Sequence, residues 1–156
     1  MHQPWYADDA GAGGRFQKIQ LYFEKLQEHG PPRGYFPEPS KSILIVKEHN
    51  KEKAETYFKD SSFKVVTGSR YLGGFIGEKA EQREWVEAKA QTWANGVIEL
   101  SKVAERCPQA ACAGLQKSLM QEWQFLQRVT DGLVEEFDDI ERSVNEKFLP
   151  APFGIE

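Results

Sequence analysis

A long apolar seam in the C-terminal half constrains the fold of this chain more than any other feature. After Glu78, apolar residues recur at alternating steps of four and three over about five helical turns. The members of this seam are Val86, Ala90, Trp93, Val97, Leu100 and Ala104. Such spacing places all of them on one face of an α-helix, which must bury that face against a partner.

Two further stretches repeat the same spacing and supply those partners. Pro108 can open the second helix at its first turn, and Asp131-Gly132 separates the second helix from the third. Their seams are Ala111, Leu115, Leu119, Trp123 and Leu126, and then Leu133, Phe137, Ile140, Val144 and Phe148. Three helices of this kind predict a bundle, in which Trp85, Trp93 and Trp123 are packing residues.

The N-terminal half mixes helix and strand patterns, so the fold class predicted for the whole chain is α+β. Apolar and aromatic residues between Phe16 and Leu26 recur at helical spacing, and Gly30-Pro31 ends that helix. The run Ile43 to Val46 is continuous and apolar, which is typical of a strand covered on both faces. Farther along, Gly68-Ser69 lies between two strand-like stretches and predicts a two-residue hairpin turn of type II′.

The stretch Trp5 to Gly14 contains two adjacent carboxylates, Asp8 and Asp9, followed by Gly-Ala-Gly-Gly. In an extended segment neighbouring side chains point to opposite faces, so the two acids can share a ligand only where the backbone turns. The glycines supply such a turn, which predicts a hairpin with acids at its tip. Paired hard oxygen ligands suit Mg²⁺, whereas an ordinary acidic β-turn is the alternative interpretation.

Charge is distributed unevenly along the chain, whose net charge of −4 by itself disfavours nucleic-acid binding. Residues 1–14 carry −2; residues 15–83 hold 13 basic and 9 acidic groups; residues 84–156 hold 7 and 13. The basic excess therefore lies in the middle of the chain.

The two cysteines, Cys107 and Cys112, lack the partners of a zinc site. No signal peptide or membrane span is visible. An intracellular protein with reduced thiols is therefore expected.

Three elements of the sequence, taken in order, resemble reverse transcriptases of retroelements such as non-LTR retrotransposons. Tyr6-Ala7-Asp8-Asp9 resembles the Tyr-x-Asp-Asp signature of the polymerase palm, and Lys41-Ser42 resembles the block that carries a lysine before a buried strand. Tyr71-Leu72-Gly73-Gly74-Phe75 resembles the Leu-Gly element of the primer grip. The resemblance implies a partial palm over residues 1–78, a helical thumb-like region over 79–130, and a helical extension and tail over 131–156.

The resemblance also implies roles for individual residues in an intact RNA-directed DNA polymerase, a nucleotidyltransferase that uses Mg²⁺, an RNA template, a DNA primer and dNTPs. Asp8 and Asp9 bind the catalytic metal, and Lys41 is a candidate proton donor to the leaving pyrophosphate. Tyr6 contacts the primer end, and Leu72, Gly73 and Gly74 belong to the primer grip.

The family also places a first palm aspartate and the fingers ahead of the Asp-Asp hairpin. This chain is therefore expected to be a fragment that is inactive alone and that pairs with the missing N-terminal half. A non-catalytic α+β module that binds nucleic acid or another protein is the alternative. A small phosphatase built on the acidic pair ranks last, because no nucleophile or phosphate loop is visible.

Overall fold

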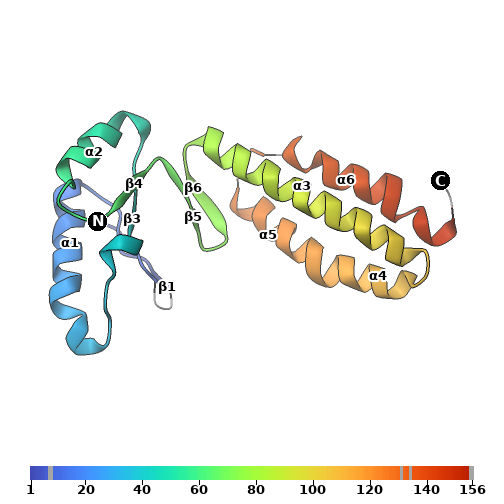
Figure 1. Ribbon diagram of the computed structural model, residues 1–156, viewed down its shortest axis with the longest axis horizontal. Coiled ribbons are helices and arrows are strands. Elements are labelled where there is room, and N and C mark those ends of the chain that lie inside the picture. The colour runs from blue at the N-terminus through green and yellow to red at the C-terminus, as the bar shows by residue number, and fades with distance from the viewer. Residues whose placement is uncertain (7–8, 131, 134, 155–156) are drawn as a thin grey trace. The chain divides into compact units, whose positions relative to one another are not determined.

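The protein, described here from a computed structural model, consists of two compact units, Met1–Thr67 and Gly68–Glu156. The structure describes residues 1–6, 9–130, 132–133 and 135–154, with the backbone alone at Tyr6. The chain is α+β: small two-stranded sheets occupy the N-terminal part, and helices make up most of the remainder (Figure 1). Within the described residues no helix is both long enough and apolar enough to cross a membrane.

The first unit combines a short hairpin, two α-helices and a parallel strand pair. Its elements are β1 (Trp5–Tyr6), β2 (Asp9–Ala10), α1 (Phe16–His29), η1 (Pro31–Arg33), η2 (Pro39–Lys41), β3 (Ile43–Ile45), η3 (Glu48–Asn50), α2 (Lys51–Tyr57) and β4 (Lys64–Val66). Strands β3 and β4 pair in parallel, with Leu44 opposite Val65. A parallel pair needs a crossover connection, and η3 with α2 supplies it.

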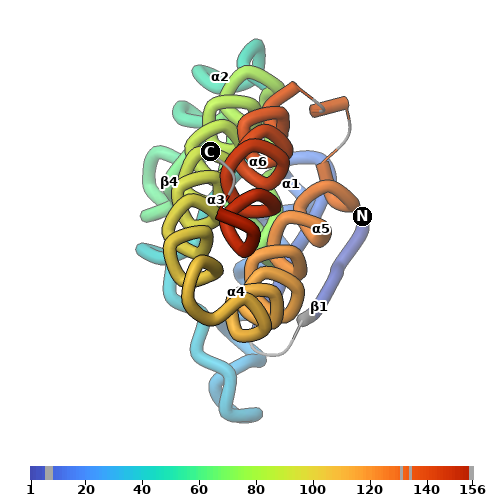
Figure 2. Tube along the Cα trace, turned by 90° about the vertical axis from the view of Figure 1, so that its right-hand side faces the viewer, coloured from blue at the N-terminus to red at the C-terminus, as the bar shows by residue number. Residues whose placement is uncertain are grey.

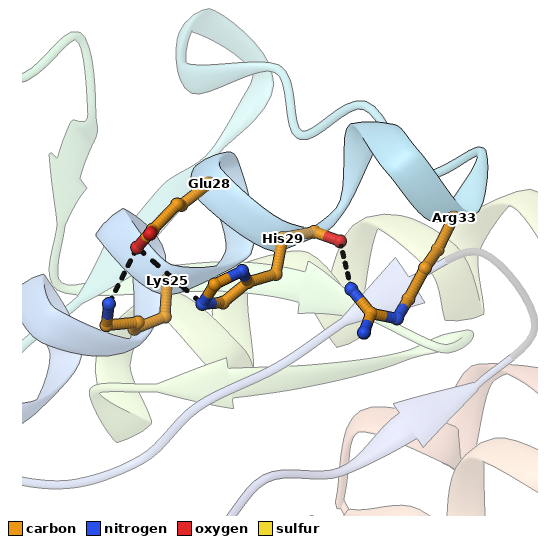
Figure 3. A network of polar contacts seen from close by, with 4 residues as sticks. All are labelled: Lys25, Glu28, His29 and Arg33. Atoms are coloured by element: carbon orange, nitrogen blue, oxygen red, sulfur yellow. Dashed lines mark hydrogen bonds and ion pairs between the residues drawn. The ribbon is translucent and has the colours of Figure 1, made fainter.

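The predicted helix after Phe16 is present, and its C-terminal end at Gly30 is confirmed. The Arg33 guanidinium donates a hydrogen bond of 2.8 Å to the main-chain oxygen of His29 and so satisfies one of the carbonyls left free at the helix end (Figure 3). One turn earlier, Lys25 Nζ lies 2.6 Å from Glu28 Oε2. That hydrogen bond, aided by the charge of His29, lowers the pKa of Glu28.

The core of this unit covers only one face of the β3–β4 pair. Leu44, Ala54 and Phe58 are buried, and the residues packed against them are Phe16, Ile19, Val46, Phe63 and Val65. On the opposite face Ile43 is half exposed and Lys64 is exposed. The prediction that the Ile43–Val46 strand is covered on both faces is therefore wrong at Ile43, although Ile45 and Val66 on the same face are partly buried.

The second unit begins with an antiparallel hairpin and continues as a helical bundle. Its elements are β5 (Gly68–Tyr71), β6 (Gly74–Gly77), α3 (Lys79–Ala104), α4 (Pro108–Gly114), the π-helical η4 (Leu115–Leu119), α5 (Met120–Val129), η5 (Glu135–Phe137), α6 (Asp138–Ser143), the π-helical η6 (Val144–Phe148) and η7 (Ala151–Phe153). Viewed along the bundle, α3 lies beside α6 and the α4–α5 run (Figure 2).

The predicted helical seams form one continuous core. Val86 and Val97 of α3 are fully buried, and Trp93 and Trp123 are buried in the same cluster, as expected for packing residues. Residues 133–151 contribute to this core as well, since Leu133, Phe137, Ile140 and Phe148 are buried in it. The helices after residue 130 therefore help to complete the bundle.

Replacing Phe148 by alanine tests this contribution. Phe148 is 2% exposed, so Phe148→Ala removes a buried ring and leaves a cavity. We expect the free energy of unfolding, measured by urea denaturation, to fall by about 3–5 kcal/mol. Phe153, which is 77% exposed, provides the control: Phe153→Ala is expected to change stability by less than about 0.5 kcal/mol. Equal effects of the two substitutions would contradict the assignment of residues 133–151 to the core.

Candidate nucleic-acid interface

The first group of predicted site residues lies on the β1–β2 hairpin. Trp5 pairs with Ala10 and Tyr6 pairs with Asp9, so the chain reverses between Tyr6 and Asp9. A bridge between His2 and Gly13 extends the pairing, with backbone hydrogen bonds of 3.0 and 2.8 Å. The predicted hairpin is therefore present. The glycines do not make its turn, however, because the register places Gly11 and Gly13 on the returning arm.

Of the acidic pair, Asp9 is exposed and begins β2, whereas Asp8 lies outside the described residues. A Mg²⁺ site with more than one protein carboxylate would need a second acid beside Asp9. Among the residues that the structure describes, no group of three or more His, Cys, Asp or Glu side chains could hold a metal ion. The metal-binding role of Asp8 and Asp9 therefore stays a prediction.

An aromatic contact joins this hairpin to the segment that leads to Lys41. The rings of Trp5 and Tyr35 meet edge to face, with their centroids 5.5 Å apart. Nearby, burial and the neighbouring Tyr35 hydroxyl raise the pKa of Tyr22. The Tyr22 hydroxyl is buried and has no hydrogen-bond partner among the described residues. The Trp5–Tyr35 contact therefore joins the hairpin to the connector that follows α1.

Lys41 is the last residue of η2 and stands two residues before β3. Its backbone N–H donates to Glu38 O at 3.1 Å, and the Ser42 hydroxyl donates to the same oxygen at 3.0 Å. The Lys41 side chain is exposed, and no ion pair between described residues involves it. The lysine therefore lies at the start of the strand on a fixed backbone, with its ammonium group in solvent.

The second group, Leu72, Gly73 and Gly74, lies in the other unit, at the tip of the β5–β6 hairpin. Gly68 pairs with Gly77 and Tyr71 pairs with Gly74, which places the reversal at Leu72-Gly73. Both turn residues have positive φ, 47° and 81°, as a type I′ turn requires. The prediction of a turn at Gly68-Ser69, with strands Phe63–Thr67 and Arg70–Leu72 paired across it, is therefore wrong.

Packing rather than a turn explains the glycine at position 68. A Cβ there would lie 2.5 Å from Glu81 Oε2 of α3 and 2.6 Å from Phe75 Cε1, across the same hairpin. Such a distance is too short for any side chain. A Gly-Ser pair is compatible with a turn and with a close contact alike, so the pattern alone could not distinguish them.

Several contacts around this hairpin were not expected from the sequence. Phe75 and Trp85 stack with ring centroids 5.7 Å apart, and the Arg70 guanidinium lies 6.0 Å from the centre of the Trp85 ring. At the tip, the position of a Cβ on Gly73 lies 3.1 Å from Phe125 Cε1. Helical periodicity could not reveal Phe125, because it lies outside the buried seam of its helix.

Charge is segregated within the second unit. Residues 68–77 and 115–130 contain Arg70, Lys117 and Arg128 and one acid, Glu122, whereas the remainder of the unit holds 7 basic and 14 acidic residues. The carboxylate of Glu122 accepts a hydrogen bond of 2.9 Å from Trp93 Nε1. The β5–β6 hairpin and the η4–α5 run therefore carry a net positive charge in an otherwise acidic unit.

The acidic side of the bundle contains an open cleft of about 480 Å³ between α3 and the η5–α6 segment. Its lining residues are Arg83, Glu87, Ala90, Gln91, Glu135, Glu136, Asp138, Asp139 and Arg142. Both arginines are paired: Arg83 Nε lies 2.7 Å from Glu136 Oε1, and Arg142 Nη1 lies 3.1 Å from Asp139 Oδ1. The cleft thus presents excess negative charge, which disfavours a polyanion on that side.

No family model matches this chain, and comparisons with curated proteins and with solved structures found no match either.

Replacing Gly73 by alanine separates backbone strain from side-chain contact at the hairpin tip. Gly73 has positive φ and meets Phe125, whereas Gly132 also has positive φ, 73°, but has no atom within 4 Å of its Cβ position. We expect Gly132→Ala to lower the free energy of unfolding by about 1 kcal/mol and Gly73→Ala to lower it further. Chemical denaturation measures both, and equal losses would show that the Phe125 contact contributes nothing.

Proposed function

We propose that this chain is the palm and thumb portion of a retroelement reverse transcriptase, and that it binds a primer–template duplex without polymerising DNA by itself. In the intact enzyme Asp8 and Asp9 would bind metal, and Lys41 would donate a proton to the leaving group. Tyr6 and the Leu72-Gly73-Gly74 tip would contact the primer. RNA template, DNA primer and dNTPs are the corresponding ligands.

The observation that carries this proposal is the pairing register of the β1–β2 hairpin. With Tyr6 opposite Asp9, the Tyr-x-Asp-Asp tetrapeptide spans the reversal of an antiparallel hairpin. The hairpin is followed along the chain by a helix, by Lys41 before a strand, and by a second hairpin whose turn is Leu72-Gly73, which is the order expected for the palm. Each element alone is common, but their joint order supports a polymerase palm over an ordinary acidic turn.

The segregated charge of the second unit supports nucleic acid as the ligand. Phosphate contacts come largely from Arg and Lys side chains, and they position a duplex without reading its sequence. Arg70 of β5 and Arg128 of α5 are both exposed, and they belong to the two elements that meet at the hairpin tip.

The exposed apolar side chains of the first unit support an N-terminal partner. Helix α1 has no fully buried residue, although it is 14 residues long. The exposed large side chains of this unit include Trp5, Leu21, Phe36, Ile43 and Tyr57. Further palm and finger segments of the parent enzyme, covering the open face of β3–β4, would remove such surface from water.

Binding of a fluorescently labelled RNA–DNA primer–template, followed by anisotropy over a salt series, tests the proposal. We expect affinity to fall steeply as salt rises, because bound phosphates release counterions. Arg70→Gln and Arg128→Gln are each expected to weaken binding and to reduce the slope of log affinity against log salt by about one.

Matched substitutions on the acidic part of the unit provide the control. Arg106 and Lys147 are also exposed and positive, so Arg106→Gln and Lys147→Gln change the net charge equally. They are expected to leave both affinity and slope close to those of the parent chain. Absence of duplex binding, or binding that is indifferent to salt and to all four substitutions, would favour a protein-interaction module instead.

Primer extension with Mg²⁺ and dNTPs tests the claim that the polypeptide is inactive alone. Two metal ions that clamp the attacking and leaving oxygens need more carboxylates than Asp8 and Asp9 provide. We therefore expect no nucleotide incorporation by the 156-residue chain. Incorporation that Asp8→Ala abolishes would refute this claim while supporting the family assignment.

A further inference from the structure

The tip of the β5–β6 hairpin lies directly against helix α5. A Cβ on Gly73 would lie 3.1 Å from Phe125 Cε1, and a Cβ on Gly74 would lie 3.3 Å from Val129 Cγ2. Both distances are shorter than ordinary van der Waals contact between carbon atoms. The backbone at the tip thus approaches α5 as closely as it does because neither position carries a side chain.

Directly after the tip, Phe75 of β6 is held by α3. Phe75 stacks on Trp85, and Gln82 Nε2 donates a hydrogen bond of 3.3 Å to the main-chain oxygen of Phe75. The hairpin therefore has two separate supports, one from each helix. A rotation of α5 relative to α3 cannot leave the tip unchanged, because its two supports would move apart.

Phe125 and Val129 contribute little to the bundle core. They are 43% and 45% exposed, whereas Trp123 and Leu126 of the same helix are buried. Their contact with the hairpin tip therefore lies outside the buried core. Substitutions at these two positions should act on the tip with little effect on global stability.

We infer that Phe125 and Val129 are positioning residues for the hairpin tip: they fix the backbone of Leu72 to Gly74 relative to α5. This contact then determines the distance between Arg70 on the hairpin and Arg128 on α5. The consequence for a bound duplex rests on the proposed function, whereas the positioning itself does not.

A size exchange at Gly74 and Val129 tests the inference on the full chain. Gly74 is not among the residues with positive φ, so Gly74→Ala adds a methyl group against Val129 without the added cost of a positive φ. We expect amide hydrogen exchange in the β5–β6 ladder to accelerate about fivefold in Gly74→Ala, and Val129→Ala to restore most of the protection in the double variant.

Val103 provides the matched control, because it is also 45% exposed and lies near the C-terminal end of α3. Val103→Ala is expected to leave the Gly74→Ala phenotype unchanged. Phe125→Leu is a second, milder variant in case Gly74→Ala fails to fold, and it is expected to accelerate exchange at the tip while the urea midpoint stays the same. Purely additive effects of Gly74→Ala and Val129→Ala, or unchanged exchange in Phe125→Leu, would overturn the inference.

Duplex affinity of the same variants separates the inference from the proposed function. Weaker binding in Gly74→Ala that recovers in the double variant supports both. A rescued exchange pattern in a protein that binds no primer–template supports the positioning role and refutes the proposed function. A rescued exchange pattern with unchanged duplex affinity supports the positioning of the tip and refutes its coupling to the ligand.

Discussion

The second unit depends on the burial of one face of helix α3. This helix is 26 residues long and places small residues, Ala90, Ala94 and Ala104, between larger ones in the core. Small residues allow neighbouring helices to approach closely, and the larger side chains fill the space between them. Leu119 lies 3.3 Å from the Cβ position of Gly96, and Leu100 lies 3.4 Å from that of Gly114, so the two helical runs interlock reciprocally.

The buried core of the first unit is smaller than that of the second. Its fully buried apolar residues are few, and aromatic contacts provide much of the remaining packing. Phe58 lies 5.6 Å from Phe16 and 5.5 Å from Phe63, measured between ring centroids, and Phe23 meets Phe63 at 4.7 Å. Aromatic pairs of this kind contribute about 0.5–1.5 kcal/mol each beyond burial. The described part of this unit is thus packed mainly through aromatic pairs around Phe58 and Phe63.

The helices were predictable from the sequence because their signal is repeated many times over. In the seam from Val86 to Ala104 each apolar residue supports the same periodicity, so one misread position changes nothing. The β1–β2 hairpin was predictable in kind, but its turn was assigned to the wrong residues. A two-residue strand offers no periodicity, and the bridge between His2 and Gly13 that extends the pairing lies outside the strands.

Glycines were the main source of error, since glycine serves both turns and close packing. At position 68 packing against Phe75 requires it, and at position 73 a positive φ and the approach of Phe125 coincide. Which reason applies depends on a residue distant in sequence, so no local pattern could distinguish them. The candidate site could likewise be predicted only in part. The tetrapeptide and the Leu-Gly-Gly element could be recognised in the sequence, whereas their contacts with Trp5, Tyr35 and α5 could not.

The acidic net charge of the chain does not decide against a polyanionic ligand. Charges on exposed groups are screened beyond about 8 Å at physiological ionic strength, which is less than the diameter of a single helix. A phosphate near Arg70 and Arg128 would therefore respond mainly to the charged groups within that distance. Glu135, Glu136, Asp138 and Asp139 lie at the cleft with α3 instead. The proposal of a nucleic-acid ligand therefore depends on the charges near the β5–β6 hairpin and not on the net charge of the chain.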